Sequence, residues 1–338
     1  MLHDHEYHSL TVADAIRETA DTRSLVLDIP PHLEETFAYD AGQFCTFRAT
    51  IDGESVVRCY SMSSSPDTRD PFSTAVKRVP GGLMSNWMND ALAPGDTIDV
   101  LRPTGLFVLR DNDAPIVAFA GGSGITPVIS ILKSALAAGR GRVMLIYANR
   151  DERSVIFSSE LRRLAAEAAG RLLVVHWLDS LHGEPTVAGM AALARPYTGA
   201  EAFACGPDPY LAVVRRALSQ LGVKAVHLER FLSLAENPFE VTEAAGGVAA
   251  ALQVSLDGAT REVPWPAGTR MLDVLIDEGL DPPYSCRQGI CGACACQLTG
   301  GEVEMAHNEV LEAEDLAEGY ILACQAVALT PEVSITYP

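Results

Sequence analysis

The sequence predicts a chain of three domains: an antiparallel β-barrel, a parallel α/β sheet, and a small domain built around a cysteine cluster. The first observation is length, since 338 residues are more than one hydrophobic core usually serves. The second is a change of rhythm near residue 110, where short alternating strands give way to strands that alternate with helices. The third is the stretch CRQGICGAC, residues 286–294, which holds three of the eight cysteines.

The first part of the chain, residues 1–110, is expected to form the antiparallel β-barrel. Apolar and polar residues alternate there over short runs, and turn residues separate the runs without long helices between them. The predicted strands are residues 24–29, 43–49, 56–62, 73–79 and 96–100.

The second part, residues 111–232, is expected to hold a five-stranded parallel sheet with helices on both faces, because strands and helices alternate along it. One of its helices is expected to have Pro127 at its first position and Thr126 as its cap. The predicted strands are residues 115–121, 142–148, 171–178, 202–205 and 225–231, and the predicted helices are residues 127–139, 158–169, 187–194 and 209–222.

Residues 233–249 are rich in Pro, Gly, Glu and Ala without a period, which is typical of a linker. After it, residues 250–338 are expected to form the third domain. That domain should begin with a hairpin that turns at Asp257-Gly258 and continue with a helix over residues 270–279.

Charge is high and unevenly distributed. The net charge of −19 argues against binding to nucleic acid, whose phosphates would repel the protein. From residue 248 onward, 14 acidic side chains stand against three basic ones, which places more than half of the net charge in the last quarter of the chain. Such a surface could serve solubility, or it could be an acidic docking face for a protein partner.

The N-terminal residues and the cysteine count bear on the compartment. The start of the chain has no basic segment leading into an apolar one, so we expect no signal peptide and a cytoplasmic location. His3, His5 and His8 are expected to lie in a mobile polar tail rather than a metal site. No apolar run reaches the length of a membrane span. In a reducing compartment, clustered cysteines are expected to be ligands rather than disulfides.

The cysteine spacing predicts an iron–sulfur cluster. Cys286, Cys291 and Cys294 follow the pattern C-x4-C-x2-C, and Cys324 comes later in the segment LACQA. Two irons with two bridging sulfides need four thiolates, and a tight loop can supply three of them. A zinc ribbon is the alternative, but it usually pairs two C-x2-C units. Cys296 is outside the pattern, so it is either without a role or a competing ligand.

These residues resemble the plant-type ferredoxins. The resemblance covers the segment from CRQGICGACACQLTGGEV to LACQ. It implies an α+β domain of the β-grasp type that carries single electrons on a [2Fe–2S] cluster.

Two motifs in the first domain resemble the flavin site of the ferredoxin–NADP reductase family. RCYS fits the family's R-x-Y-S, which implies that Arg58 pairs with a flavin pyrophosphate, Tyr60 packs on the flavin and Ser61 lies near the reactive N5. GLMS resembles the family's G-x-x-S, in which N–H groups at a helix start bind phosphate. The implied residues of the second motif are Gly82, Met84 and Ser85. Taken alone, the four residues RCYS would more often belong to an ordinary strand.

Two loops of the second domain resemble the nicotinamide site of the same family. AGGSGITP lies between a strand and a helix, where glycines let the backbone approach a pyrophosphate. The resemblance assigns Gly121, Gly122, Gly124 and Thr126 to this site. CGPDPY matches the family's C-G-P, which adds Gly206 and Pro207 and puts Cys205 near the nicotinamide C4. A buried structural cysteine is the alternative for Cys205.

The segment HLERF resembles the segment that closes the reductase in this family. The resemblance implies that Glu229 helps to place the nicotinamide and that Phe231 stacks on the isoalloxazine ring. Here the chain continues beyond Phe231, so packing in the core is an equal alternative for this aromatic side chain.

The order flavin domain, nicotinamide domain and ferredoxin is that of the reductase components of multicomponent oxygenases. The resemblance implies that electrons pass from NADH through FAD and a [2Fe–2S] cluster to a terminal oxygenase, of Rieske type, which docks on the acidic domain. Residues 134–157 and 310–326 look closest to the reductase of 3-ketosteroid 9α-hydroxylase. The reductase of phenylacetyl-CoA epoxidase has a similar layout.

The sequence leaves open which nicotinamide nucleotide and which flavin the protein binds. Arg150 could bind the 2′-phosphate of NADPH, but Asp151 and Glu152 follow it and would repel that phosphate, which favours NADH. FAD rather than FMN is implied by the family layout. A binding protein that only senses redox state is the alternative of another class. A self-contained oxygenase is disfavoured because the sequence shows neither a 2-His-1-carboxylate set nor a haem segment.

Overall fold

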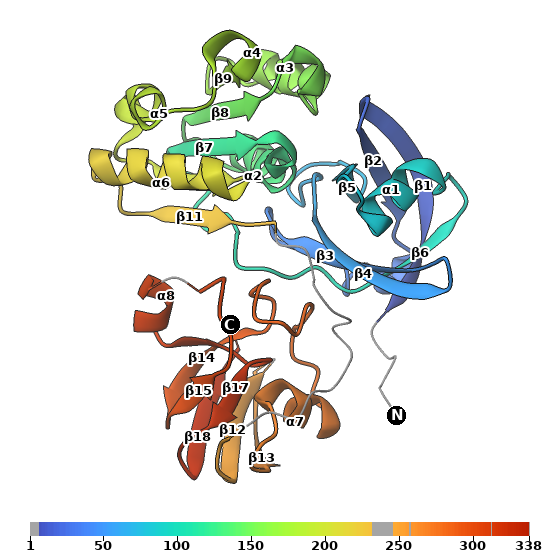
Figure 1. The fold of residues 1–338 in the computed structure, drawn as a ribbon, viewed down its shortest axis with the longest axis vertical. Helices are drawn as coiled ribbons and strands as arrows, with labels where there is room; N and C mark the ends of the chain where they lie inside the picture. The colour runs from blue at the N-terminus through green and yellow to red at the C-terminus, as the bar shows by residue number, and fades with distance from the viewer. Residues whose placement is uncertain (1–6, 232–245, 257, 312, 338) are drawn as a thin grey trace. The chain divides into compact units, whose positions relative to one another are not determined.

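The structure is a computed structural model that describes residues 7–231, 246–256, 258–311 and 313–337 (Figure 1). The chain forms two compact units, which are taken separately below. The larger comprises residues 4–103 and 107–231, and the smaller comprises residues 1–3, 104–106 and 232–338. Most of the predicted linker, residues 233–249, lies outside the described residues.

An antiparallel sheet of six strands opens the larger unit, in the order β4-β3-β6-β1-β2-β5. An isolated bridge joins Met62, the residue after the edge strand β4, to Thr74 of the other edge strand β5, so the sheet curls back on itself as predicted. The strands are β1 (His8–Thr19), β2 (Thr22–Asp28), β3 (Phe44–Ile51), β4 (Glu54–Ser61), β5 (Ser73–Lys77) and β6 (Thr97–Val100). A 3₁₀ turn (Pro31–Leu33) and the helix α1 (Leu83–Asp90) complete this part.

The strand β1 corrects the expectation of a mobile N-terminal tail. His8 begins β1, where it lies opposite Val100 of β6, and its ring meets Phe37 edge to face at 5.6 Å. Leu10 and Val12 of this strand are fully buried, and burial of that alternate apolar row outweighs the polar neighbours. His3 and His5 lie outside the described residues.

The other part of the larger unit is the predicted five-stranded parallel sheet, in the order β11-β10-β7-β8-β9. Its strands are β7 (Ile116–Gly121), β8 (Val143–Asn149), β9 (Leu172–Leu178), β10 (Glu201–Cys205) and β11 (Val226–Glu229). Its helices are α2 (Ile125–Ala137), α3 (Ser158–Glu167), α4 (Asp179–His182), α5 (Val187–Ala194) and α6 (Asp208–Leu221). Short 3₁₀ turns span Gly122–Gly124, Glu152–Ser154 and Arg195–Tyr197.

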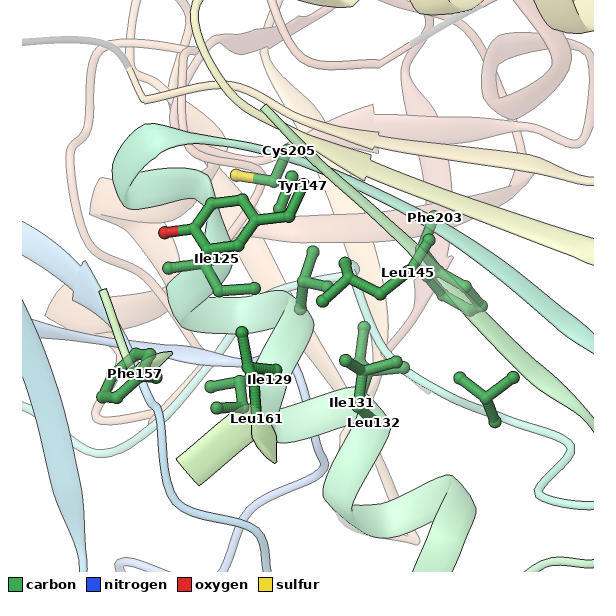
Figure 2. Packing of buried hydrophobic residues seen from close by; sticks show 14 of the residues in the cluster. Ile125, Ile129, Ile131, Leu132, Leu145, Tyr147, Phe157, Leu161, Phe203 and Cys205 are labelled. Atoms are coloured by element: carbon green, nitrogen blue, oxygen red, sulfur yellow. The ribbon is translucent and has the colours of Figure 1, made fainter. Parts of the chain in front are cut away.

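Alternate residues of β7 serve two cores on opposite faces of this sheet. Ala118 points to the core that contains α2 and α3, whereas Phe119 points to the core with α5 and α6. Figure 2 shows the first core, where Ile125 and Ile129 of α2 pack near Tyr147 of β8. This core also includes Ala75 of β5, so the barrel and the parallel sheet share buried surface within the larger unit.

The start of α2 corrects a detail of the prediction. The helix begins at Ile125, so Pro127 is its third residue and Thr126 is inside its first turn rather than at the cap. Pro127 is tolerated there because the first N–H groups of a helix have no partner within the helix. The Thr126 hydroxyl donates instead to the Ser123 carbonyl at 2.9 Å and holds the preceding turn.

The smaller unit contains a mixed sheet in the order β13-β12-β18-β14-β16 and a pair β15-β17. Its strands are β12 (Ala250–Leu256), β13 (Ala259–Trp265), β14 (Ala295–Gly300), β15 (Val303–Met305), β16 (Tyr320–Leu322), β17 (Ala326–Ala328) and β18 (Glu332–Thr336). Leu256 pairs with Ala259, which confirms the predicted hairpin. The helix α7 (Met271–Asp277) packs Leu272 and Leu275 into the core beside Trp265, and α8 (Ala313–Ala317) precedes β16.

No helix of the described residues has both the length and the apolar composition needed to cross a membrane.

Candidate functional site

The end of β4 carries the RCYS motif. Arg58 and Tyr60 are two residues apart and therefore lie on the same face of the strand. Desolvation raises the pKa of Tyr60, whose ring meets Phe47 edge to face at 5.6 Å. Ser61 is buried, and its carbonyl accepts a hydrogen bond from the Thr74 hydroxyl at 2.7 Å. The strand end is therefore held firmly while Arg58 and Tyr60 are only half-buried.

The segment GLMS forms the start of α1. Gly82 is the N-cap and offers no side chain, so the first N–H groups of the helix are left to another partner. The Ser85 hydroxyl accepts from the Val79 N–H at 3.1 Å and fixes the turn before the helix. Met84 packs in the barrel core, so only its backbone N–H could contribute to phosphate binding.

Two glycine loops meet at the carboxyl edge of the parallel sheet, one after β7 and one after β10. A Cβ atom on Gly124 would lie 2.1 Å from the Cys205 carbonyl oxygen, and one on Gly206 would lie 3.1 Å from the Gly121 Cα. A Cβ on Gly121 would lie 3.0 Å from Pro207 Cδ. Gly122 has a φ of +54°, a left-handed conformation that favours glycine. Glycine is therefore required here because two backbones touch.

Unpartnered polar groups lie at the same edge. Both polar atoms of the buried Asn149 side chain, at the end of β8, lack a hydrogen-bond partner by distance and angle in the described part of the chain. Desolvation raises the pKa of the nearby Tyr147, and the Asn149 amide only partly offsets that rise. The Oδ1 atom of Asp179, just after β9, is also buried and unpartnered within the described ranges. Ligands of parallel sheets bind outside the carboxyl ends of the strands, so these atoms are suited to a nucleotide.

Asn149 and Asp179 were not among the residues predicted from the sequence, which pointed only to Arg150 in this region. The signal that could have found them is their position directly after two of the predicted strands, residues 142–148 and 171–178. Arg150 is 70% exposed and its guanidinium forms an ion pair with Asp21 at 3.2 Å. Arg150 is thus already engaged by a carboxylate of the β1–β2 turn.

Glu229, at the end of β11, reaches the end of β4. The Ser61 hydroxyl donates to a Glu229 carboxylate oxygen at 3.5 Å, which brings together the residue expected near the flavin N5 and the one expected to place the nicotinamide. Desolvation raises the pKa of Glu229 to about 8, and the Ser61 hydroxyl only partly offsets that rise. Cys205 is fully buried within the hydrophobic core, and burial raises the pKa of its thiol well above the ordinary value.

The raised pKa of Glu229 predicts a pH dependence of stability. Between the ordinary value of 4.5 and about 8, the folded protein binds the proton that the unfolded chain releases, so stability falls as pH rises through this window and is level above it. We expect Glu229→Gln to remove this component. Thermal unfolding of the flavin-free protein from pH 5 to 9 measures it, and equal slopes for both proteins would contradict the prediction.

Phe231 is 47% exposed in the structure. This exposure argues against the alternative of plain core packing and leaves the ring face accessible to a partner.

The four cysteines of the predicted pattern gather in the smaller unit as two pairs. Contact with the Cys291 thiol and with backbone N–H groups lowers the pKa of Cys286 to about 6 in spite of burial. Contact with the Cys294 thiol lowers the pKa of Cys324. Two thiols for each of two irons is the donor set that a [2Fe–2S] cluster requires. Among the described residues, no three Cys, His, Asp or Glu side chains are gathered as in a single-ion site.

Hydrogen-bond donors surround these sulfur atoms. The N–H of Gln288 donates to Cys286 Sγ at 3.3 Å, and the N–H of Cys324 donates to Cys294 Sγ at 3.4 Å. The side-chain amide of Gln325 donates both to Cys324 Sγ at 3.4 Å and to the Arg287 carbonyl at 2.9 Å. Such donors stabilise thiolates, so the loop is suited to a negatively charged iron–sulfur centre.

Arg287 and Cys296 are the remaining notable side chains of the cysteine loop. Arg287 forms a largely buried ion pair with Asp273 and adds a positive charge near Cys294 and Cys324. It was not predicted from the sequence, although it is the only basic residue in CRQGICGAC. Cys296 lies in β14 within the core, where burial raises its pKa to about 12 in spite of the nearby Tyr337 hydroxyl.

Three families of known proteins match separate parts of the chain. Residues 9–109 match the model of the oxidoreductase FAD-binding domain. Residues 119–216 match the oxidoreductase NAD-binding domain, and residues 254–329 match the 2Fe-2S iron-sulfur cluster binding domain.

Similar proteins match nearly the whole chain. The 3-ketosteroid-9-alpha-monooxygenase ferredoxin reductase component of Rhodococcus rhodochrous is 48% identical over 337 residues, which cover 97% of this chain and 96% of that protein. A component of the 1,2-phenylacetyl-CoA epoxidase of Escherichia coli is 34% identical, and the match covers 98% of both chains. Among solved structures, phthalate dioxygenase reductase aligns over 98% of both chains with a TM-score of 0.59 and 25% identity.

The cofactors of the chain follow from these domains: FAD, a nicotinamide nucleotide and a [2Fe–2S] cluster. Because the domain models and relatives matched over nearly the full length agree, the chain belongs to the family of monooxygenase ferredoxin reductase components, which are electron-transfer oxidoreductases.

Proposed function

We propose that this protein takes electrons from NADH and delivers them, through FAD and a [2Fe–2S] cluster, to the terminal oxygenase of a 3-ketosteroid 9α-monooxygenase. The observation that carries the proposal is the 48% identity to such a reductase over 96% of its length. Bound FAD accepts two electrons together and releases them singly, which is what a one-electron [2Fe–2S] cluster needs. The proposed domains are residues 1–110, 111–232 and 250–338, with a linker at 233–249.

The flavin is proposed to lie along the end of β4. Arg58 provides a cation for the pyrophosphate, and the half-buried Tyr60 provides a ring face for the flavin. The N–H groups in the first turn of α1, from Leu83 to Ser85, supply donors to a phosphate, while the Gly82 N–H donates to the Val79 carbonyl at 2.9 Å. Ser61 holds the Glu229 carboxyl in place, and Phe231 offers an accessible ring.

The nicotinamide nucleotide is proposed to bind at the carboxyl edge of the parallel sheet. The loops at Gly121–Gly124 and Gly206–Pro207 let it approach the backbone, and Thr126 holds the turn between the first loop and α2. Asn149 and Asp179 supply polar atoms that lack partners among the described residues. Cys205 and Glu229 stand at the ends of neighbouring strands, beside the reacting ring.

NADH is proposed over NADPH because Arg150, the residue that could bind the 2′-phosphate of NADPH, already forms an ion pair. Arg150 forms its ion pair with Asp21, and Asp151 and Glu152 follow it in the sequence. A 2′-phosphate would have to displace a carboxylate and approach two others, which costs Coulomb energy. Comparing the rate of flavin reduction by the two nucleotides checks this, and a strong preference for NADPH would contradict it.

The oxygenase is proposed to dock on the acidic third domain, in which Cys286, Cys291, Cys294 and Cys324 hold the cluster. Fourteen acidic against three basic side chains from residue 248 onward would attract a basic surface on the partner. If this is correct, electron transfer to the oxygenase slows as ionic strength rises, since salt screens such steering.

The decisive experiment mixes the purified protein with NADH and a terminal oxygenase. Hydroxylation of a 3-ketosteroid by a Rieske-type 9α-oxygenase is the expected result. Support for the phenylacetyl-CoA epoxidase alone would instead favour the function of the relative at 34% identity. Flavin that is not bleached by NADH would indicate a binding protein without reductase activity. The flavin released on heating should be FAD, and FMN would contradict the proposal.

A further inference from the structure

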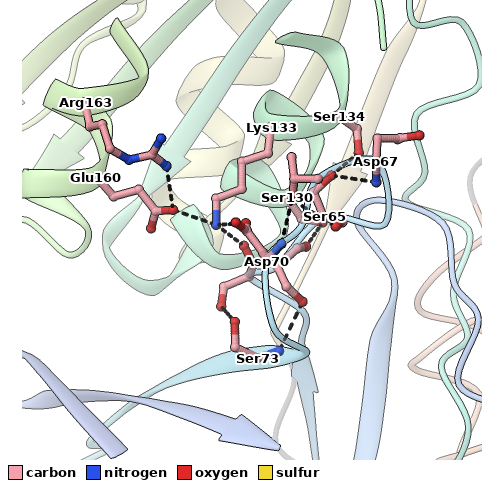
Figure 3. A network of polar contacts seen from close by, with 12 residues as sticks. Ser65, Asp67, Asp70, Ser73, Ser130, Lys133, Ser134, Glu160 and Arg163 are labelled. Atoms are coloured by element: carbon pink, nitrogen blue, oxygen red, sulfur yellow. Dashed lines mark hydrogen bonds and ion pairs between the residues drawn. The ribbon is translucent and has the colours of Figure 1, made fainter. Parts of the chain in front are cut away.

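One face of α2 forms polar contacts with the loop that follows β4, the strand that carries the RCYS motif. Ser130, Lys133 and Ser134 are spaced three and four residues apart, so they lie on one side of the helix. All three contact the segment between β4 and β5, residues 62–72, as Figure 3 shows. Both elements belong to the larger unit.

Lys133 is at the centre of these contacts between α2 and the loop after β4. Its side chain is 5% exposed, and its ammonium lies 2.8 Å from Asp70, 2.8 Å from Glu160 and 2.9 Å from the Ser63 carbonyl oxygen. One cation thus connects the loop after β4 with α2 and α3. Arg163 adds a second, more distant contact to Glu160 at 3.7 Å.

Two serine hydroxyls strengthen the same contact. The Ser130 hydroxyl donates to the Ser64 carbonyl at 2.6 Å and accepts from the Gly42 N–H at 3.3 Å. The hydroxyls of Ser65 and Ser134 are 2.7 Å apart. The loop is therefore held at three successive residues, Ser63, Ser64 and Ser65.

The helix α2 connects these contacts to the glycine loop at Gly121–Gly124. Its first residue, Ile125, directly follows Gly124, and Lys133 lies about 12 Å further along the axis at the usual rise of a helix. Ser63 is two residues beyond Ser61. The helix α2 thus has the glycine loop at its N-terminal end. Further along, Lys133 holds it to the segment that directly follows β4.

We propose that Lys133 is a positioning residue that sets the separation between the nicotinamide and the flavin. This inference rests on the proposed function of the two loops. An interface could also be stabilised by apolar residues, since burying charges costs desolvation energy that the attraction repays only with good geometry. The ion pairs of Lys133 with Asp70 and Glu160 additionally fix the direction and the distance of the loop after β4.

Lys133→Met tests the inference, with Lys224→Met as the control. Lys224 is exposed in the loop before β11, in the same unit. The control therefore loses one charge without disturbing the contacts between α2 and the loop after β4. We expect Lys133→Met to slow flavin reduction at saturating NADH by about 10- to 100-fold, because a displacement of about 1 Å between reactants costs that much. The dissociation constant for NADH should stay close to that of the unaltered protein.

A spectroscopic readout separates positioning from mere stability. Nicotinamide stacked on a flavin gives a long-wavelength charge-transfer absorbance, which needs close contact of the two rings. We expect this absorbance to be weakened in Lys133→Met and unchanged in Lys224→Met. Lys133→Arg, which keeps the charge, should recover part of both the rate and the absorbance.

Lys133→Met leaves Asp70 without its cation and Glu160 with only the more distant Arg163, so this variant can fail to fold. The triple variant Lys133→Met, Asp70→Asn, Glu160→Gln therefore serves as a second test. It removes both carboxylate charges and should be stable but still slow. A folded triple variant with an unaltered reduction rate and absorbance would overturn the inference. If NADH does not reduce the flavin of the unaltered protein, the proposed function fails, whereas normal reduction in every variant refutes only the role of Lys133.

Discussion

Replacing Cys324 by alanine is expected to remove the [2Fe–2S] cluster while NADH still reduces the flavin. Cys324 forms a pair with Cys294, so its loss leaves one iron with a single thiolate. Altering a group that only supports a metal ligand commonly costs 10- to 100-fold in affinity, and the loss of a ligand should cost more than about 100-fold. Cys324 and the glycine loops belong to different compact units, which is why flavin reduction should persist.

Cys296→Ala is the matched control for this prediction. Cys296 is two residues from Cys294, but the side-chain contact of its thiol is with the Tyr337 hydroxyl rather than with a cysteine of the pattern. We expect it to keep the cluster, with only a modest loss of stability from the small cavity. Iron content, visible absorption and the paramagnetic signal of the reduced protein distinguish the variants. A cluster that survives in Cys324→Ala but not in Cys296→Ala would show that the wrong cysteine was assigned.

Local patterns in the sequence were sufficient for most of the architecture. The alternation of strands and helices between residues 115 and 231 predicted the five-stranded sheet, since each apolar run is long enough to signal its own element. The cysteine spacing predicted which thiols come together for a similar reason, because three of them lie on one short loop.

The features that were missed depend on contacts between distant parts of the chain. The polar start of β1 hid a strand that is fixed by pairing with β2 and β6. Asn149 is notable only because no partner among the described residues satisfies its amide in the fold. Lys133 is an ordinary residue of an apolar helix in the sequence, and its partners Asp70 and Glu160 become visible only in three dimensions.

Gly124→Ala is expected to abolish efficient reduction by NADH without loss of flavin or cluster. The new Cβ would lie 2.1 Å from the Cys205 carbonyl oxygen and 2.7 Å from the Gly206 nitrogen. Both atoms belong to the backbone and no side-chain rotation relieves the overlap, so the loops after β7 and β10 must move apart. Such overpacking typically costs about 1–3 kcal/mol of stability. A shift of about 1 Å should slow flavin reduction about 100-fold.

Gly199→Ala is the control, because a Cβ at Gly199 has no atom within 4 Å and its φ is not in the left-handed region. Its free energy of unfolding should change by no more than about 0.5 kcal/mol, and its reduction rate should not change. The two alanines add the same methyl group to the same parallel-sheet domain, so the difference between them isolates the contact between the loops. Anaerobic stopped-flow measurement of flavin bleaching gives the rates, and flavin and iron content confirm that both cofactors are retained. A normal rate in Gly124→Ala would contradict the proposal that the nicotinamide binds where these two loops touch.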